Sequence, residues 1–352
     1  METVVKSKRI FYLDALRALA ILCVMIVHVY AITRFIVKGD YGSFQWFFSQ
    51  LWGNPFRIGV DLFLMLSGAL SLGRKWDIRT FLGKRIPRII EPFLFWNLIL
   101  FGILLICSYL GYSHFLTSFD LGSISNALYN TFFVPSGEFR PNWFFWMILG
   151  TYLIMPIFNK WLLHCDMKEV EYFLVIWLVT CIFDFTINKE CPIKLTYFTS
   201  PIGLVVLGYY LRHTKRKIYE NKYFVLLLIL IPAIIVMLIA YVYSTPTKMV
   251  YSNRYSFFLA VEVAGVFLLF RNYVNNINED GIVYKFIFSL AKYSYGIYLF
   301  HYFLIYRLFD FLRGGYTPLV MIILLVSTIV ICLCVMAVLN SVPYLNKIIG
   351  AK

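Results

Sequence analysis

Apolar residues in this chain are gathered into long runs that short polar connections separate. Most runs approach the ~20 residues that a helix needs to cross a bilayer, although the fifth and sixth are short and interrupted. The pattern predicts an all-α, polytopic integral membrane helical bundle that forms one domain over residues 1–352. We expect about ten transmembrane helices, at residues 10–34, 52–73, 91–111, 142–162, 170–187, 197–212, 223–243, 254–272, 286–311 and 316–341.

Composition agrees with a membrane protein. Hydrophobic residues make up 61% of the chain, charged residues only 14%, and the mean hydropathy is +0.76. The net charge of +14 does not indicate a nucleic-acid partner, because no soluble basic domain is left to bind one. The 7 cysteines include no C-x-x-C pair, and the 5 histidines show no paired ligand spacing. We therefore expect neither a disulfide framework nor a metal site.

The positive charges indicate how the predicted spans are oriented. About twenty lysines and arginines fall on one side and about ten, thinly spread, on the other. Lysine and arginine are enriched in the cytoplasmic connections of membrane proteins. We therefore expect both termini in the cytoplasm and a multi-pass protein of the cell membrane, plasma or inner. The longest outer connection, roughly 112–141, is polar enough to cap a pocket.

Three ionisable residues share one face of the first predicted span. At ~100° and ~1.5 Å per residue, Asp14, Arg17 and His28 fall within an arc of roughly 60°, and Arg17 and His28 stand ~16 Å apart. An ionisable group at bilayer depth costs several kcal/mol unless it faces protein or water. The stripe therefore indicates a functional interior face. The alternative is that neighbouring helices merely satisfy these charges.

Depth along the predicted spans separates two kinds of chemistry. Histidines and carboxylates, which suit acid–base catalysis, gather toward the outer face: His28, Asp61, Asp184, Glu262 and His301. Cations, which suit an anion site, gather toward the cytoplasmic face: Arg17, Lys84, Arg85, Arg88 and the stretch 212–217. Topology alone would account for many of the cations. Burial beside a partner would account for His301 and Glu262.

Five blocks of sequence follow one another across residues 10–305. They are YLDALRALAILCVMIVHV, IGVDLFLMLSGAL, KRIPRIIEPFLFW, NWFFWMILGTYLIMPIF and YSYGIYLFHYFLI. Each resembles a motif of the acyltransferase-3 family, whose first motif is an Arg, ten residues and a His. Those positions are Arg17 and His28 here, and the last block ends its motif on His301. Asn142 departs from the family pattern, which usually has Leu there.

This resemblance implies an integral membrane O-acyltransferase. Such an enzyme moves an acetyl group from cytoplasmic acetyl-CoA to a sugar hydroxyl of a cell-surface or lipid-linked glycan. Acetyl-CoA would be the acyl donor, and the lipid bilayer and the glycan would be the other partners, without a metal. The layout resembles relatives that lack an extra esterase-like domain, so we expect the membrane domain to act alone or with a separate protein.

The candidate residues fit roles in this reaction. His28 would be the general base or an acyl carrier, since imidazole titrates near working pH. Asp14 would fix Arg17 from one turn away. Asp61, Glu262 or His301 would bind the second nitrogen of His28 and so orient the ring. The role of Asp61 is inferred only from its predicted depth in the membrane. The CoA phosphates would bind Arg17, Lys84, Arg85 and Arg88. The acceptor sugar would meet Trp143, Asn142 and Tyr298.

A transporter or flippase for glycans or anions is the alternative function. It would also need many spans, buried charges and a basic inner face. Consumption of a cytoplasmic donor separates the two readings, because an enzyme releases free CoA when its acceptor is supplied and a carrier does not.

Overall fold

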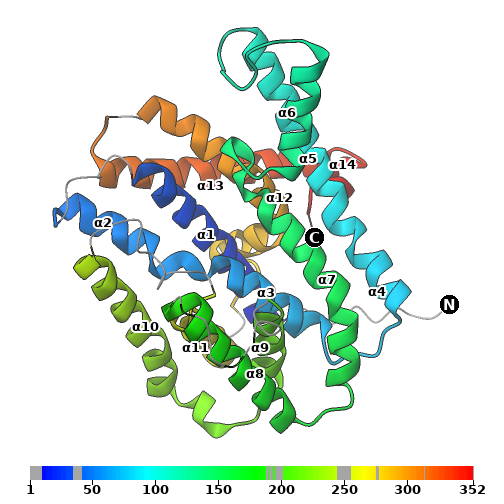
Figure 1. Ribbon diagram of the computed structural model, residues 1–352, viewed down its shortest axis with the longest axis vertical. Helices are drawn as coiled ribbons and strands as arrows, with labels where there is room; N and C mark the ends of the chain where they lie inside the picture. Colours follow the sequence, from blue (N-terminus) through cyan, green and yellow to red (C-terminus); the bar gives the residue numbers. More distant parts are fainter. Residues whose placement is uncertain are drawn as a thin grey trace.

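The computed structural model describes residues 10–34, 42–187, 189, 193, 195, 201–243, 255–274, 277–312 and 314–351. Every regular element in these residues is helical, which confirms the all-α fold (Figure 1). The first half contains α1 (Phe11–Thr33), α2 (Phe44–Gly53), η1 (Pro55–Ile58), α3 (Gly59–Ser71), α4 (Ile78–Arg85), α5 (Pro87–Tyr109), α6 (Leu121–Phe133), η2 (Gly137–Asn142) and α7 (Trp143–Leu162). The second half contains α8 (Met167–Ile182), η3 (Phe183–Ile187), α9 (Ile202–His213), η5 (Lys217–Glu220), α10 (Lys222–Tyr243), α11 (Phe257–Tyr273), α12 (Ile282–Leu312), α13 (Thr317–Ser341) and α14 (Leu345–Ile348).

Six helical stretches among the described residues are long and apolar enough to cross a membrane. They are Phe11–Thr33, Ile78–Tyr109, Leu121–Leu162, Met167–Ile187, Lys222–Val242 and Thr317–Ser341. The protein is therefore a helical membrane protein. The six stretches correspond to the predicted spans at 10–34, 91–111, 142–162, 170–187, 223–243 and 316–341.

The other four predicted spans differ from this simple picture. α3 and α9, within the predicted spans 52–73 and 197–212, have 13 and 12 residues. At ~1.5 Å per residue they reach only about 20 and 18 Å, short of a ~30 Å hydrocarbon core. The predicted spans 254–272 and 286–311 correspond to α11, with 17 residues, and α12, with 31. Residues 196–200 and 254 lie outside the described residues.

The two short helices pack against each other by their backbones. A Cβ at Gly68 of α3 would overlap the carbonyl of Val205, and a Cβ at Gly208 of α9 would overlap the carbonyl of Met65. Small residues allow this close approach between membrane helices, where van der Waals contact drives association. We therefore attribute the apolar sequences of α3 and α9 to their burial against each other inside the protein.

α1 lies near the centre of the bundle, among other helices (Figure 1). It packs against α3, α11, α12 and α13. Leu16, Ile21 and Met25 of α1 are completely buried. By contrast, α10 lies at an edge and leaves Leu230, Ile234 and other large apolar side chains exposed, as a lipid-facing helix does.

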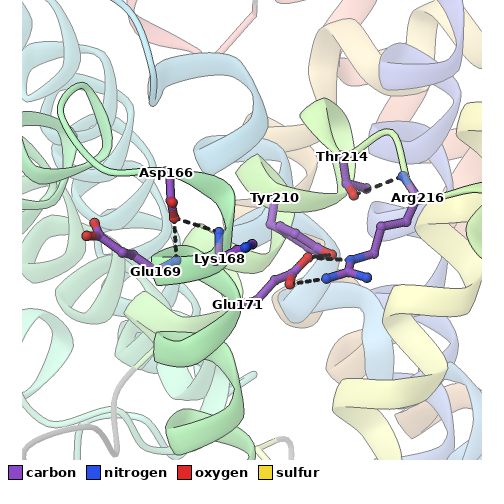
Figure 2. Close-up of polar contacts among 7 residues, drawn as sticks. All are labelled: Asp166, Lys168, Glu169, Glu171, Tyr210, Thr214 and Arg216. Atoms are coloured by element: carbon purple, nitrogen blue, oxygen red, sulfur yellow. Dashed lines mark hydrogen bonds and ion pairs between the residues drawn. The ribbon is translucent and has the colours of Figure 1, made fainter.

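Charged side chains hold the end of the bundle at which α1 begins, called here the Arg17 end (Figure 2). Glu171 of α8 accepts hydrogen bonds from the Tyr210 hydroxyl at 2.6 Å and from the Arg216 guanidinium. Arg212 donates to the Ala69 carbonyl at 2.5 Å. Arg212 therefore connects α9 to α3, and Arg216 connects the segment between α9 and η5 to α8.

Side chains that accept from backbone N–H groups define where several helices begin. This capping satisfies donors that have no partner within the helix. The capping residues are Ser43 for α2, Asp77 for α4, Asp120 for α6, Asp166 for α8 and Ser256 for α11. Figure 2 includes Asp166, which accepts from the N–H groups of Lys168 and Glu169 at 2.9 Å each.

Candidate active site

Two histidines from distant parts of the sequence meet inside the bundle. His28 lies in the last turns of α1, and His301 lies on α12, which packs along α1. His28 Nδ1 is 2.7 Å from His301 Nε2, and the two rings stack with centroids 4.9 Å apart. His301 is fully buried, whereas His28 is partly exposed. The contact therefore joins a buried imidazole to one that reaches open space.

Hydrogen bonding assigns the protons of this pair. His301 Nδ1 lies 3.0 Å from the carbonyl oxygen of Ile297 and 2.8 Å from that of Tyr298. Carbonyl oxygens only accept, so Nδ1 of neutral His301 donates and its Nε2 carries a lone pair. His28 Nδ1 must then donate to that Nε2, which puts the lone pair of neutral His28 on its own Nε2. His28 is thus held in the tautomer of a proton acceptor.

His28 lines an open cavity of about 900 Å³, called here the His28 cavity. Its lining comes from α1, η1, α3, α7 and α12, and includes Val24, Phe56, Arg57, Val60, Trp143 and Tyr298. Gly59 brings η1 against α1, because a Cβ there would lie 2.7 Å from the Ala20 carbonyl. Arg57, two residues before Gly59, lines the same cavity as His28.

A second cavity, partly open to its surroundings, lies nearer the start of α1 and is called here the Arg17 cavity. Arg17 and Arg85 both line it. Arg17 Nη1 donates to Asp14 Oδ1 at 3.0 Å, and Arg85 Nη2 donates to the Ser71 hydroxyl at 2.9 Å. Two guanidinium groups therefore face one cavity, and each is positioned by a neighbouring oxygen. Such a pair is suited to an anion.

Tyr298 lines both cavities. Its ring is buried against Phe144, with centroids 4.6 Å apart. Its hydroxyl donates to the Pro141 carbonyl at 3.1 Å, and its own carbonyl accepts from His301. Tyr298 therefore contributes to the walls of both cavities and also, through its carbonyl, to the hydrogen bonds that orient His28.

The structure separates the remaining sequence-predicted residues from these cavities. Lys84 and Arg88 are exposed and line neither cavity. Asn142 is buried, and its amide donates to Asn97 at 2.6 Å and to the Thr131 carbonyl at 2.8 Å. It therefore ties α5, α6 and α7 together, whereas Trp143 and Tyr298 do line the His28 cavity.

The predicted carboxylates Asp61 and Glu262 are buried but are not part of the wall of the His28 cavity. Asp61 of α3 is 0% exposed and Glu262 of α11 is 3% exposed, and neither lines the His28 cavity. They interact electrostatically with each other. The second nitrogen of His28 is instead met by His301, the third candidate for that position. Similar predicted depth had grouped these carboxylates with His28, but depth does not determine the direction in which a helix presents a side chain.

Two residues of the site were missed in the sequence. Arg57 lines the His28 cavity, and the Tyr302 ring meets His28 edge-on with centroids 4.9 Å apart. Arg57 stands directly before the block IGVDLFLMLSGAL, on the side where cations are sparse, which was a usable signal. Tyr302 gave none beyond its place next to His301.

Comparison with known families gives this arrangement its context. A family model described as an acyltransferase domain, that of the acyltransferase-3 family, matches residues 10–337. The chain belongs to the acyltransferase-3 family. The match includes all five sequence blocks and both histidines, so the resemblance seen in the sequence is confirmed. Comparison with curated proteins and with solved structures gave no match. This acyltransferase is therefore assigned through its family and its own geometry.

Proposed function

We propose that this acyltransferase moves an acetyl group from acetyl-CoA to a hydroxyl of a cell-surface or lipid-linked glycan, with His28 as the catalytic base. The observation that carries the proposal is the hydrogen bond between His28 Nδ1 and His301 Nε2 at 2.7 Å. It leaves the His28 lone pair on Nε2, on a ring that lines an open cavity. A base must present such a lone pair within reach of the hydroxyl proton.

The reaction needs one proton transfer in each direction. The acceptor oxygen attacks the thioester carbon and forms the new C–O bond while its proton passes to His28 Nε2. Collapse of the tetrahedral intermediate breaks the C–S bond, and the imidazolium returns the proton to the leaving CoA thiolate. His301 Nε2 accepts from His28 Nδ1 throughout, so the ring stays oriented while it is charged. General bases of this kind contribute about 10²- to 10⁴-fold to rate.

His28 as an acyl carrier uses the same lone pair. Nε2 would attack the thioester and release CoA, and the acetyl-imidazole would then pass its acetyl group to the acceptor hydroxyl. Both routes depend on His28 and on its orientation by His301. A trapped acetyl-enzyme, seen by mass spectrometry when acetyl-CoA is added without acceptor, would select the carrier route.

The Arg17 cavity suits the donor. The CoA nucleotide carries several negative charges, and Arg17 and Arg85 present two guanidinium groups to one cavity. Arg17 and His28 stand ~16 Å apart on an ideal helix, which a pantetheine arm can span. Tyr298 lines both cavities, so the thioester would pass beside its ring to reach His28.

The test is a donor-consumption assay on the purified chain in nanodiscs. Acetyl-CoA is supplied with and without a glycan fraction from the source membrane, free thiol is followed, and the glycan is analysed for a gain of acetyl. The proposal predicts CoA release that needs the glycan and a matching mass gain. Movement of glycan across a vesicle membrane with no CoA release would instead establish transport and overturn it.

A further inference from the structure

Four arginines converge on the end of the bundle at which α1 ends, called here the His28 end. They come from four different elements: Arg34 caps α1, Arg57 lies in η1, Arg140 in η2 and Arg307 in α12. This end is the one predicted to face outward, where lysine and arginine are normally depleted. The excess of positive charge that orients a membrane protein therefore does not explain these four arginines.

Three of these arginines are connected to the surroundings of His28. Arg57 lines the His28 cavity itself. Arg34 and Arg140 both interact electrostatically with Tyr302, whose ring meets His28 edge-on with centroids 4.9 Å apart. Arg307 lies on the same helix as His301, two turns further along. Arg57 is thus part of the cavity wall, and Arg34 and Arg140 lie within electrostatic range of a ring that contacts His28.

Two of these arginines make contacts that fix where their guanidinium groups lie. Arg307 pairs with Glu138 at 2.6 Å, which fastens η2 to α12. Arg57 Nε donates to the Gly53 carbonyl at 3.2 Å, and the side chain lines the His28 cavity. Glu138 of η2 and Asp310 of α12 are carboxylates near this cluster, and the four arginines outnumber them, so the net charge at this end is positive.

The His28 cavity also has aromatic side chains of the kind that bind sugar rings. Trp143 and Tyr298 line it together with Arg57. Flat aromatic side chains provide an apolar surface against which a sugar ring can pack, and guanidinium forks match carboxylate and phosphate groups. The CoA phosphates do not explain these arginines, because the proposed donor site lies at the opposite end of α1.

We infer that the acceptor of this acyltransferase is an anionic glycan, whose carboxylate or phosphate is bound by Arg57 and Arg140 while a neighbouring hydroxyl faces His28. The inference rests on the proposed function and names the class of its acceptor. An anionic lipid headgroup has similar charge but no sugar ring for Trp143. Binding of such a headgroup instead is an outcome that the experiment distinguishes.

The experiment measures binding, so it does not depend on turnover. The full chain in phosphatidylcholine nanodiscs is titrated by calorimetry with tetragalacturonate, glucose 1-phosphate and neutral maltotetraose. We expect at least one of the two anionic sugars to bind more tightly than maltotetraose, and this preference to weaken as salt rises from 50 to 500 mM. Arg57→Gln and Arg140→Gln should each lower affinity for that sugar about ten- to a hundredfold. Arg57→Lys should recover only part of the loss, because lysine lacks the fork.

Arg79→Gln is the matched control, because Arg79 is exposed on α4 at the Arg17 end and should leave sugar binding unchanged. Equal affinity for anionic and neutral sugars, or equal losses in Arg57→Gln and Arg79→Gln, would overturn the inference. So would Arg57-dependent binding of soluble dihexanoyl phosphatidylglycerol with no binding of either anionic sugar. Glycan-dependent CoA release with neutral acceptors alone would overturn it while leaving the proposed function standing.

Discussion

His28 Nδ1 and His301 Nε2 lie 2.7 Å apart although 273 positions separate them in the chain. Under the proposed function, the contact makes α12 part of the active site, because the orientation of His28 on α1 depends on a ring that α12 carries. His301 is in turn fixed by two carbonyls of its own helix. The backbone of α12 thus sets the tautomer of a side chain on α1.

The first prediction concerns His301 as a positioning residue. His301→Leu removes the acceptor for His28 Nδ1–H, so we expect kcat to fall more than about tenfold while the KM for acetyl-CoA stays unchanged. His301→Gln restores a side-chain acceptor and should recover part of the loss. The pH profile of kcat should shift in His301→Leu, because the imidazolium of His28 loses its hydrogen-bond partner. Unchanged kcat and pH profile in a well-folded His301→Leu protein would refute the positioning role.

The second prediction separates two neighbouring arginines. Arg85 lines the Arg17 cavity, whereas Arg88 is exposed one turn away. Arg85→Gln should raise the KM for acetyl-CoA about three- to tenfold and reduce its dependence on salt, with little change in kcat at saturation. Arg88→Gln is the matched control and should leave the KM near that of the wild type. Equal effects of the two substitutions would mean that these cations act through overall charge or orientation in the membrane.

The third prediction tests the backbone contact between α3 and α9. Gly68→Ala should destabilise the protein by about 1–3 kcal/mol or more, because its Cβ would overlap the Val205 carbonyl. Gly102→Ala in α5 is the control: its Cβ would meet nothing within 4 Å, and the change should be neutral or slightly stabilising. Thermal unfolding of both variants in the same detergent measures the difference. A Gly68→Ala protein as stable as Gly102→Ala would contradict the close pairing.

Hydropathy predicted the long helices well and the short pair poorly. The predicted spans 142–162 and 316–341 correspond to α7 and α13 within about one residue, because the length of an apolar run sets the length of a spanning helix. The same measure failed for α3 and α9, since residues buried in protein are as apolar as residues facing lipid. Only the positions of Gly68 and Gly208 hinted at their pairing.

The candidate site was predictable where helical periodicity applied. The stripe on α1 requires only 3.6 residues per turn, and Asp14 and Arg17 do form an ion pair at 3.0 Å. Depth along different helices was less informative, because it gives height but not direction. Asp61 therefore shares the predicted height of His28 without lining its cavity. Arg57 was missed because its place depends on how closely η1 approaches α1, which the sequence alone does not reveal.

The fourth prediction tests the orientation of the bundle. In a cysteine-free background, Ser136→Cys at the His28 end should react with an impermeant maleimide added outside intact cells. Lys217→Cys at the Arg17 end should react only after the cells are opened. Both positions are exposed, so accessibility of the side chain itself does not differ. The reverse labelling pattern would place the Arg17 cavity outside and remove cytoplasmic acetyl-CoA as its ligand.

The most direct measurement of the central claim is glycan-dependent CoA release by His28→Ala. The variant and the wild type are compared in nanodiscs at equal amounts, after thermal unfolding has shown that both are folded. Loss of the lone pair on Nε2 removes both the base and the acyl carrier, so we predict a fall in turnover of at least about 10²-fold with acetyl-CoA binding retained. Wild-type rates of acetyl transfer in folded His28→Ala would contradict the account.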